Sequence, residues 1–159
     1  VDIIFFDAED WGTKNSTPET EDSYALGTQF WAKKPHVENY TASYGILLDM
    51  AGARNAKFFM EGHSMQYASG IVRKIWDHAN RAGFSDYFIY KEGGYITDDH
   101  LYVNRLISIP SVDIIHTNSE GRFAPHWHTH GDNMDVIDKN TLNAVGQTVL
   151  EVLFHESGA

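Results

Sequence analysis

The sequence predicts an α/β protein, a three-layer sandwich in which helices flank a mostly parallel central sheet. Short apolar runs typical of buried strands alternate with amphipathic helical patterns, which favours parallel strands joined by helices. No repeat or linker divides the chain, and its 159 residues are enough for one hydrophobic core. We therefore expect residues 1–159 to form a single domain.

The first half of the chain begins with a nearly unbroken apolar run, VDIIFF (1–6), which predicts a strand buried on both faces. A polar loop follows, and a helix is expected over 23–34. The apolar run at 44–50 predicts a second buried strand, and a short third strand is expected at 57–60. Apolar residues at helical spacing predict an amphipathic helix over 64–82.

In the second half, a strand is expected at 86–90, and a glycine turn then leads to a helix beginning near Thr97 or Asp98. The run at 109–116 predicts another strand, followed by a long irregular loop. Asp138 is a suitable N-cap for the amphipathic helix that closes the chain.

Composition excludes several classes of function. The formal net charge of −10 argues against nucleic acid or an anionic membrane as a partner. No apolar run approaches the roughly 18 residues that span a bilayer. The absence of cysteine excludes disulfides and Cys-based zinc sites, and no phosphate-binding glycine loop or G-x-S-x-G elbow is present. Metal-assisted acid–base chemistry is the interpretation that remains.

Acidic and histidine side chains follow the ends of the predicted strands. Glu9 and Asp10 come after the first strand, Asp49 ends the second, and the loop 117–137 with its HWHTHGD motif follows a later one. Ligands of open α/β sheets bind outside the carboxyl ends of the strands. The sequence therefore brings these segments to one edge of the sheet.

Each segment also has a purely structural interpretation. DAED (7–10) is either a solvated turn or a pair of acids of which one binds metal while its neighbour stays free as a base. Asp49 either caps a turn or is ligated, and Asp98 either caps a helix or takes part in the chemistry. His100 is expected to pack within its helix. Trp127 either lines a pocket or packs its loop onto the domain.

Only one histidine of HWHTHGD is expected to bind metal, which leaves His126 and His130 as bystanders. The remaining histidines are expected on surface helices or loops without a chemical role: His36, His63, His78, His116 and His155.

Four motifs resemble those of glutaminyl cyclases, in the same order, and most closely the bacterial enzymes similar to the animal type. They are FFDAED, LLDMAGA, GGYITDDHLYVNR with IPSVDII, and WHTHGDNMDVID before the last helix. The resemblance runs from residue 1 to about residue 156. Because these enzymes share a fold with di-zinc aminopeptidases, it implies a zinc-exopeptidase-like sandwich.

The resemblance implies a single zinc ion with Asp10 and His128 among its ligands. Glu9 would be the general acid/base, and Asp49 and Asp98 would hydrogen-bond near it and hold or relay its proton. The implied reaction converts the N-terminal glutamine of peptides or proteins to pyroglutamate and releases ammonia.

Trp127, with Trp11 and Phe123, is expected to bind the small substrate side chain. A periplasmic or secreted location follows from the resemblance alone, and no oligomeric state is indicated.

Two departures from the family pattern affect the metal site. Asp10 stands where the animal enzymes have Glu, and the family's first zinc aspartate lies upstream of VDIIFFD. We therefore expect the chain to be the C-terminal portion of a longer catalytic domain, and to bind zinc poorly by itself.

Two alternatives remain open. In a di-zinc aminopeptidase, which releases N-terminal amino acids, Asp49 would bind a second zinc and Glu9 would activate a bridging water. An inactive relative would use the same fold as a binding module. The tryptophan directly before the candidate ligand His128 and the LLDMAGA segment favour the cyclase.

Overall fold

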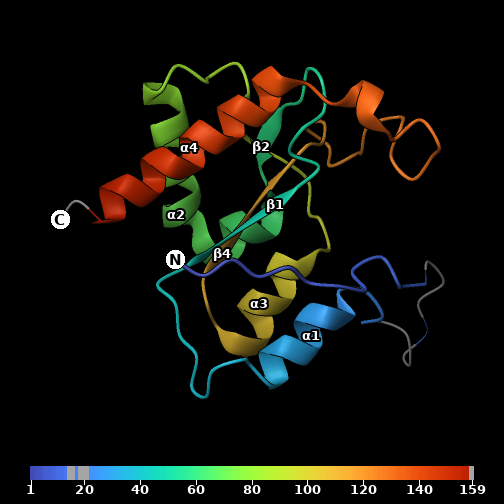
Figure 1. Ribbon diagram of the computed structural model, residues 1–159, viewed down its shortest axis with the longest axis vertical. Helices are drawn as coiled ribbons and strands as arrows, with labels where there is room; N and C mark the ends of the chain where they lie inside the picture. The colour runs from blue at the N-terminus through green and yellow to red at the C-terminus, as the bar shows by residue number, and fades with distance from the viewer. Residues whose placement is uncertain (14–16, 18–21, 158–159) are drawn as a thin grey trace.

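The structure, a computed structural model, describes residues 1–13, 17 and 22–157, and it has the predicted α/β architecture (Figure 1). Every helix and strand expected beyond residue 22 is present. In chain order the elements are α1 (Leu26–Lys33), β1 (Gly45–Asp49), β2 (Phe58–Met60), α2 (Gly62–Arg81), β3 (Phe88–Glu92), α3 (Asp99–Ile107), β4 (Ser111–Ile115), the 3-10 turn η1 (Met134–Val136) and α4 (Lys139–Ser157).

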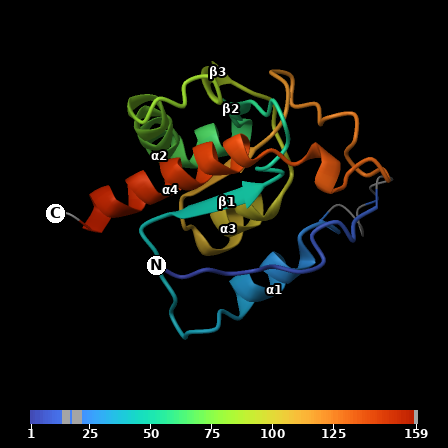
Figure 2. The ribbon, with the colours of Figure 1, turned by 45° about the horizontal axis from the view of Figure 1, so that its top comes forward.

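The strands form two parallel pairs between two layers of helices. β1 pairs with β4, from Gly45 opposite Ser111 to Asp49 opposite Ile115, and β2 pairs with β3. An isolated antiparallel bridge between Phe58 and His116 joins the two pairs. Helices α2 and α4 pack together on one side, and α1 packs on α3 on the other (Figure 2).

The hydrophobic core lies between the strands and the α2–α4 layer. Trp76 of α2 is fully buried, and its ring meets that of Phe88 edge-on at 5.2 Å between centroids. Its indole Nε1 donates a hydrogen bond to the carbonyl of Ile89 at 3.1 Å. The polar end of this large side chain is thus paired while its rings contribute apolar burial.

The segment 1–6 does not form the strand that its composition predicts. It lies outside both pairs of strands, and Val1, Ile3 and Phe5 are 96%, 80% and 93% exposed. Its attachments run to the α1 side, where the ring of Phe6 contacts that of Trp31 at 5.6 Å. An apolar run becomes a buried strand only where a neighbouring strand pairs with its backbone, and no described strand does so here.

Side-chain caps set the starts of the helices that carry the site. Glu61 caps α2, which therefore begins at Gly62 and not at residue 64. Asp98 caps α3, as predicted, by accepting a hydrogen bond from the N–H of Asp99. At the start of α4, the side chain of Asp138 accepts from the N–H of Asn140 at 2.8 Å.

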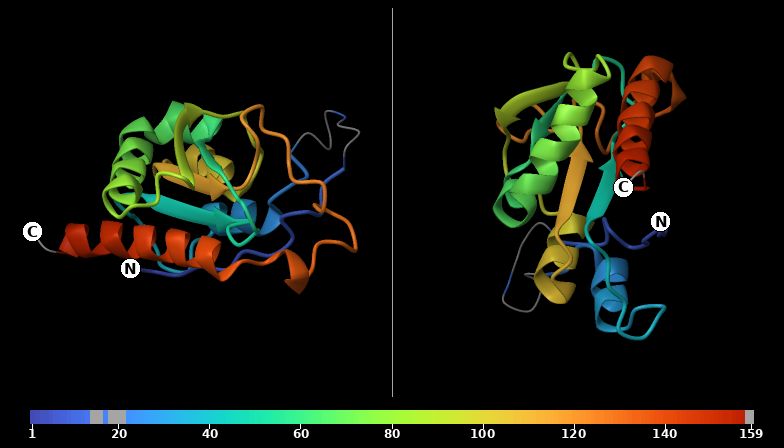
Figure 3. Two further views of the ribbon diagram at one scale, coloured as in Figure 1. Left: turned by 90° about the horizontal axis from the view of Figure 1, so that it is seen from above. Right: turned by 90° about the vertical axis from the view of Figure 1, so that its left-hand side faces the viewer.

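The parallel pairing of β1 and β4 sets the position of the site. Both strands point the same way, so the end of β1 at Asp49 and the start of the long loop after β4 share one edge (Figure 3).

None of the helices in the described ranges combines the length and apolarity that a membrane crossing requires.

Candidate active site

The acidic loop is anchored to the first turn of α1 through backbone atoms. The carbonyls of residues 7–9 accept hydrogen bonds from the N–H groups of residues 25–27, at N···O distances of 2.8 to 3.2 Å. These N–H groups have no hydrogen-bond acceptor within α1, so the loop carbonyls supply the acceptors that the first turn of the helix lacks. The contact is close: a Cβ on Gly27 would lie 2.4 Å from the carbonyl oxygen of Asp7.

Helix α1 is in turn fixed to the start of α3. The hydroxyl of Thr28 donates to a carboxylate oxygen of Asp99 at 2.5 Å, and both side chains are buried. The acidic loop and the acids at the start of α3 therefore share one support.

The two predicted metal ligands are in contact although 118 residues separate them. Nε2 of His128 lies 2.9 Å from Oδ2 of Asp10. Ligands of a tetrahedral zinc ion, each about 2.1 Å from the metal, lie about 3.4 Å apart. A small separation of the two donor atoms would make room for the ion between them.

An aromatic stack lies against His128, whose side chain remains partly exposed. The ring of Trp127 stacks on it, with centroids 3.8 Å apart and planes inclined by 19°, and the ring of Phe123 stacks on Trp127 at 4.3 Å. Both residues were predicted to bind substrate. Trp11, predicted for the same role, is 80% exposed. His130 is exposed on the same loop.

The three predicted catalytic acids affect one another electrostatically. Burial raises the pKa of Glu9 to about 7, and the neighbouring carboxylates of Asp10, Asp99 and Asp49 contribute to the rise. Burial likewise raises the pKa of Asp98 to about 8, with the charges of Asp49 and Glu9 acting in the same direction. The pKa of Asp49 is also raised, first by burial. These side chains therefore lie close enough together to hinder each other's ionisation.

Backbone strain occurs in three of the converging segments. Ala8 has a φ of 51°, Met50, directly after Asp49, has a φ of 46°, and His128 has a φ of 55°. Each left-handed residue costs roughly 1 kcal/mol or more. Strain of this kind persists where the surrounding structure enforces it, which is common at functional sites.

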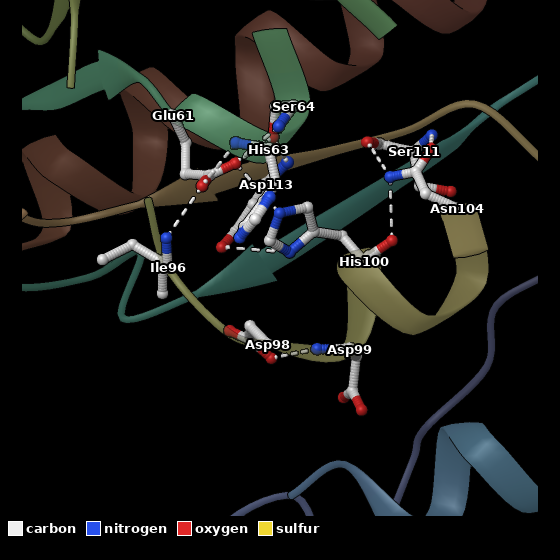
Figure 4. Close-up of polar contacts among 10 residues, drawn as sticks. All are labelled: Glu61, His63, Ser64, Ile96, Asp98, Asp99, His100, Asn104, Ser111 and Asp113. Carbon is white, nitrogen blue, oxygen red and sulfur yellow. Dashed lines mark hydrogen bonds and ion pairs between the residues drawn. The ribbon is translucent and has the colours of Figure 1, made fainter. Parts of the chain in front are cut away.

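A buried network that sequence reasoning missed supports the acids of α3 (Figure 4). The carboxylate of Glu61 accepts from His63 N–H, Ser64 N–H, the Ser64 hydroxyl, Ile96 N–H and His100 Nε2, at 2.6 to 2.9 Å. It thus joins the start of α2, the chain before α3 and α3 itself. The signal in the sequence was a glutamate directly before a helix whose third residue is serine, a capping position.

Asp113 is the second residue that was missed. It is fully buried in the middle of β4, and its Oδ2 lies 3.6 Å from Nδ1 of His100. Burial raises its pKa well above the usual value, with the charges of Asp98 and Glu61 adding to the effect. An acid inside the apolar run SVDII was the available signal, because a buried carboxyl needs a partner. His100 packs within its helix, as predicted, and is also hydrogen-bonded.

The residues present fit a zinc ion. A carboxylate oxygen and an imidazole nitrogen are ordinary zinc ligands, and they meet beside several carboxyl groups whose pKa values are raised by burial first and by mutual repulsion in addition. A divalent cation would reduce that repulsion. Asp10 and His128 would hold it, with Glu9 left free beside it.

A parallel α/β fold with carboxylates and one histidine at the strand ends defines the zinc-exopeptidase class. Residues 1–153 match the model of Peptidase family M28, and the chain belongs to this family. No curated protein matches it.

Solved structures agree with the family assignment. A Zn-dependent exopeptidase from Parabacteroides distasonis is 56% identical, with a TM-score of 0.89, over 94% of this chain and 52% of that one. Bacteroides thetaiotaomicron glutaminyl cyclase bound to N-acetylhistamine is 50% identical, with the same TM-score and coverage. A leucine aminopeptidase precursor from Bacteroides thetaiotaomicron is 49% identical, with a TM-score of 0.87, over 94% and 51%. The chain thus spans about half the length of these relatives.

We predict that Gly27→Ala weakens zinc binding at the Asp10–His128 pair at least about tenfold, because the new methyl must displace the acidic loop. Zinc titration of the full-length protein, followed by tryptophan fluorescence, measures this, since Trp127 stacks on His128. Gly70→Ala in α2 is the matched control, because a Cβ there meets no atom within 4 Å. Equal zinc affinities of the two variants would contradict the anchoring role of Gly27.

A second prediction concerns acid stability. Burial by itself would raise the pKa of Glu61, but the hydrogen bond and charge of His100, with backbone N–H groups, lower it from 4.5 to about 2. The group therefore stabilises the fold above pH 4.5 and loses this contribution as the pH falls toward 2. The stability difference between wild type and Glu61→Gln should shrink by about 3 kcal/mol over that range.

Urea unfolding of both proteins between pH 5 and pH 2, with a chelator present throughout, measures this difference. The other acids are common to the two proteins and cancel in the comparison. Parallel stability curves would show that the Glu61 carboxylate is not held in its ionised form by the network.

Proposed function

We propose that the chain provides the acid/base and pocket half of a zinc-dependent glutaminyl cyclase, which converts the N-terminal glutamine of peptides to pyroglutamate. The observation that carries the proposal is the set of side chains that surround the Asp10–His128 pair. Glu9, with a pKa near neutrality, directly precedes Asp10 on the acidic loop, and the ring of Trp127, itself stacked on Phe123, lies against His128. The third metal ligand would come from the part of the protein outside this chain.

In this reaction the α-amine of the substrate attacks its own γ-amide carbon. One C–N bond forms, the amide C–N bond breaks, and ammonia leaves. Glu9 takes the proton from the attacking nitrogen and delivers it to the departing nitrogen. A pKa of about 7 suits both steps, because the group can accept and return a proton near neutral pH.

The remaining acids support Glu9. With its pKa raised to about 8, Asp98 keeps a proton at neutral pH and can donate a hydrogen bond to a neighbouring carboxylate. Asp49 is held near these acids at the end of β1. Zinc, when bound, supplies Lewis-acid polarisation of the γ-carbonyl.

The aromatic rings of Trp127 and Phe123 would orient the glutamine side chain of the substrate. Nucleophile and electrophile belong to one residue, so the site must hold a small side chain in the folded geometry that permits ring closure. The stacked rings of Trp127 and Phe123 beside the candidate ligand His128 would provide a wall for such a site, and their edges would keep water away from the amide.

A di-zinc aminopeptidase is the second candidate, favoured by the similarity to a leucine aminopeptidase precursor and a Zn-dependent exopeptidase. In that case Asp49 would bind a second ion. The stacking of Trp127 on the candidate ligand His128 favours the cyclase, whose site would enclose a small side chain beside the metal.

The full-length protein should release ammonia from a peptide with N-terminal glutamine and leave its peptide bonds intact. Ammonia release and free amino acids are measured in parallel on Gln-Ala-Ala and on Leu-Ala-Ala. Release of leucine or glutamine without ammonia would overturn the cyclase assignment and support the aminopeptidase.

Glu9→Gln should lower kcat by about 10²- to 10⁴-fold while zinc content stays the same, because the acid/base is lost and the ligands remain. Wild-type kcat/KM should fall at acidic pH as Glu9 becomes protonated, with a midpoint at or below the pKa of about 7 that the group has without the metal, and the variant should lack this component. Titration of the substrate amine remains in both enzymes. Glu38→Gln, at an exposed acid, is the matched control; a similar loss of activity in both variants would exclude the role of Glu9.

A further inference from the structure

Three side chains with metal-binding atoms gather where α4 packs on α2, apart from the acids of the candidate active site. His78 belongs to α2, and Glu151 and His155 belong to α4. The two helices pack on one another (Figure 1). Each offers one ligand atom, and these three atoms lie within 4.8 Å of one another. His78 and His155 were both expected to be surface residues without a chemical role.

The two residues on α4 already have a spacing suited to a metal ion. Glu151 and His155 are four positions apart, so they lie on the same face of the helix. His155 Nε2 is 3.4 Å from Glu151 Oε1. Two ligands of a tetrahedral zinc ion lie about 3.4 Å apart, so the separation of these two atoms matches that of a zinc site.

His78 supplies the third ligand from the neighbouring helix. The expectation that it lies on the surface is wrong: it is only 5% exposed, because α4 covers it. Its ring centroid is 4.7 Å from that of His155, and its Nδ1 is buried with no hydrogen-bond partner among the described residues. A buried nitrogen without a partner is destabilising, and a nearby metal ion can relieve this.

The charges around the three residues are compatible with a cation. Burial lowers the pKa of His78, and the charges of His155 and Arg81 act in the same direction. The neutral imidazole is the form that binds metal. Lys74, the other nearby cation, is paired with Glu156, and Glu151 supplies the compensating negative charge.

We propose that His78, Glu151 and His155 form a second zinc site that ties the C-terminal turns of α4 to α2. Two imidazoles and one carboxylate suit zinc and similar transition ions, whereas magnesium and calcium prefer oxygen ligands alone. The side chains of His155 and Glu151 are 56% and 44% exposed, so water can fill the fourth position. The site joins two helices and holds no catalytic acid, so its role is structural.

The test uses the full-length protein with His128→Ala as background, so that the outcome does not depend on the proposed catalytic zinc. Zinc binding is measured by calorimetry, and the melting temperature is measured with and without zinc. The background protein should bind zinc and melt at a higher temperature in its presence, and magnesium should have no such effect. Adding His155→Ala should weaken zinc binding at least about tenfold and abolish the shift in Tm.

Two further variants in the same background control for indirect effects. Glu151→Gln keeps the size of the side chain and should also weaken zinc binding. His36→Ala removes an exposed histidine on the α1 side and should leave binding and the Tm shift unchanged. The proposal is overturned if the background protein gains no stability from zinc, or if binding survives loss of His155.

Discussion

The buried carboxylate of Glu61 is the interaction on which the arrangement of the site depends. It accepts hydrogen bonds from the first turn of α2, from Ile96 in the chain before α3, and from His100 of α3. A buried charge is stable only while its partners remain in place, so the carboxylate holds α2, the segment before α3 and α3 in one arrangement. The position of Asp98 at the start of α3, and with it the acid cluster, follows from this arrangement.

The network around Glu61 helps to hold the site in an energetically unfavourable state. Carboxyl groups converge at the strand ends, their pKa values rise, and backbone strain collects in the same segments, including at His128. Repulsion and strain of this kind would separate the segments of an unsupported loop. Here the backbone bonds to α1, the pair Thr28–Asp99 and the network around Glu61 oppose the separation. The site is thus prepared for a cation by groups that do not touch it.

The sequence predicted the elements well because their signals are local. Hydrophobic periodicity and capping residues located the α-helices and strands described beyond residue 22, though not the 3-10 turn η1. The expectation that ligands bind at the carboxyl ends of parallel strands placed Asp49 near the acidic loop. What it could not predict depends on tertiary partners. Segment 1–6 has strand composition but no pairing strand in the described structure, and His78 is buried only because α4 packs on it. Glu61 and Asp113 have roles set by contacts with α3, which no local pattern encodes.

The hydrogen bonds that attach the acidic loop to α1 end at residue 9, so the backbone of Glu9 is fixed by them and that of Asp10 is not. The three hydrogen bonds use backbone carbonyls up to Glu9, so they place few demands on side-chain identity, apart from the need for glycine at position 27. Asp10 lies just beyond the last of these bonds, where the chain can shift to adjust the reach of its side chain. Exchange between Glu and the shorter Asp at this position can therefore be tolerated without moving the neighbouring Glu9. The architecture thus fixes the backbone of the candidate acid/base Glu9 on α1 and leaves the backbone of the candidate metal ligand Asp10 outside these bonds.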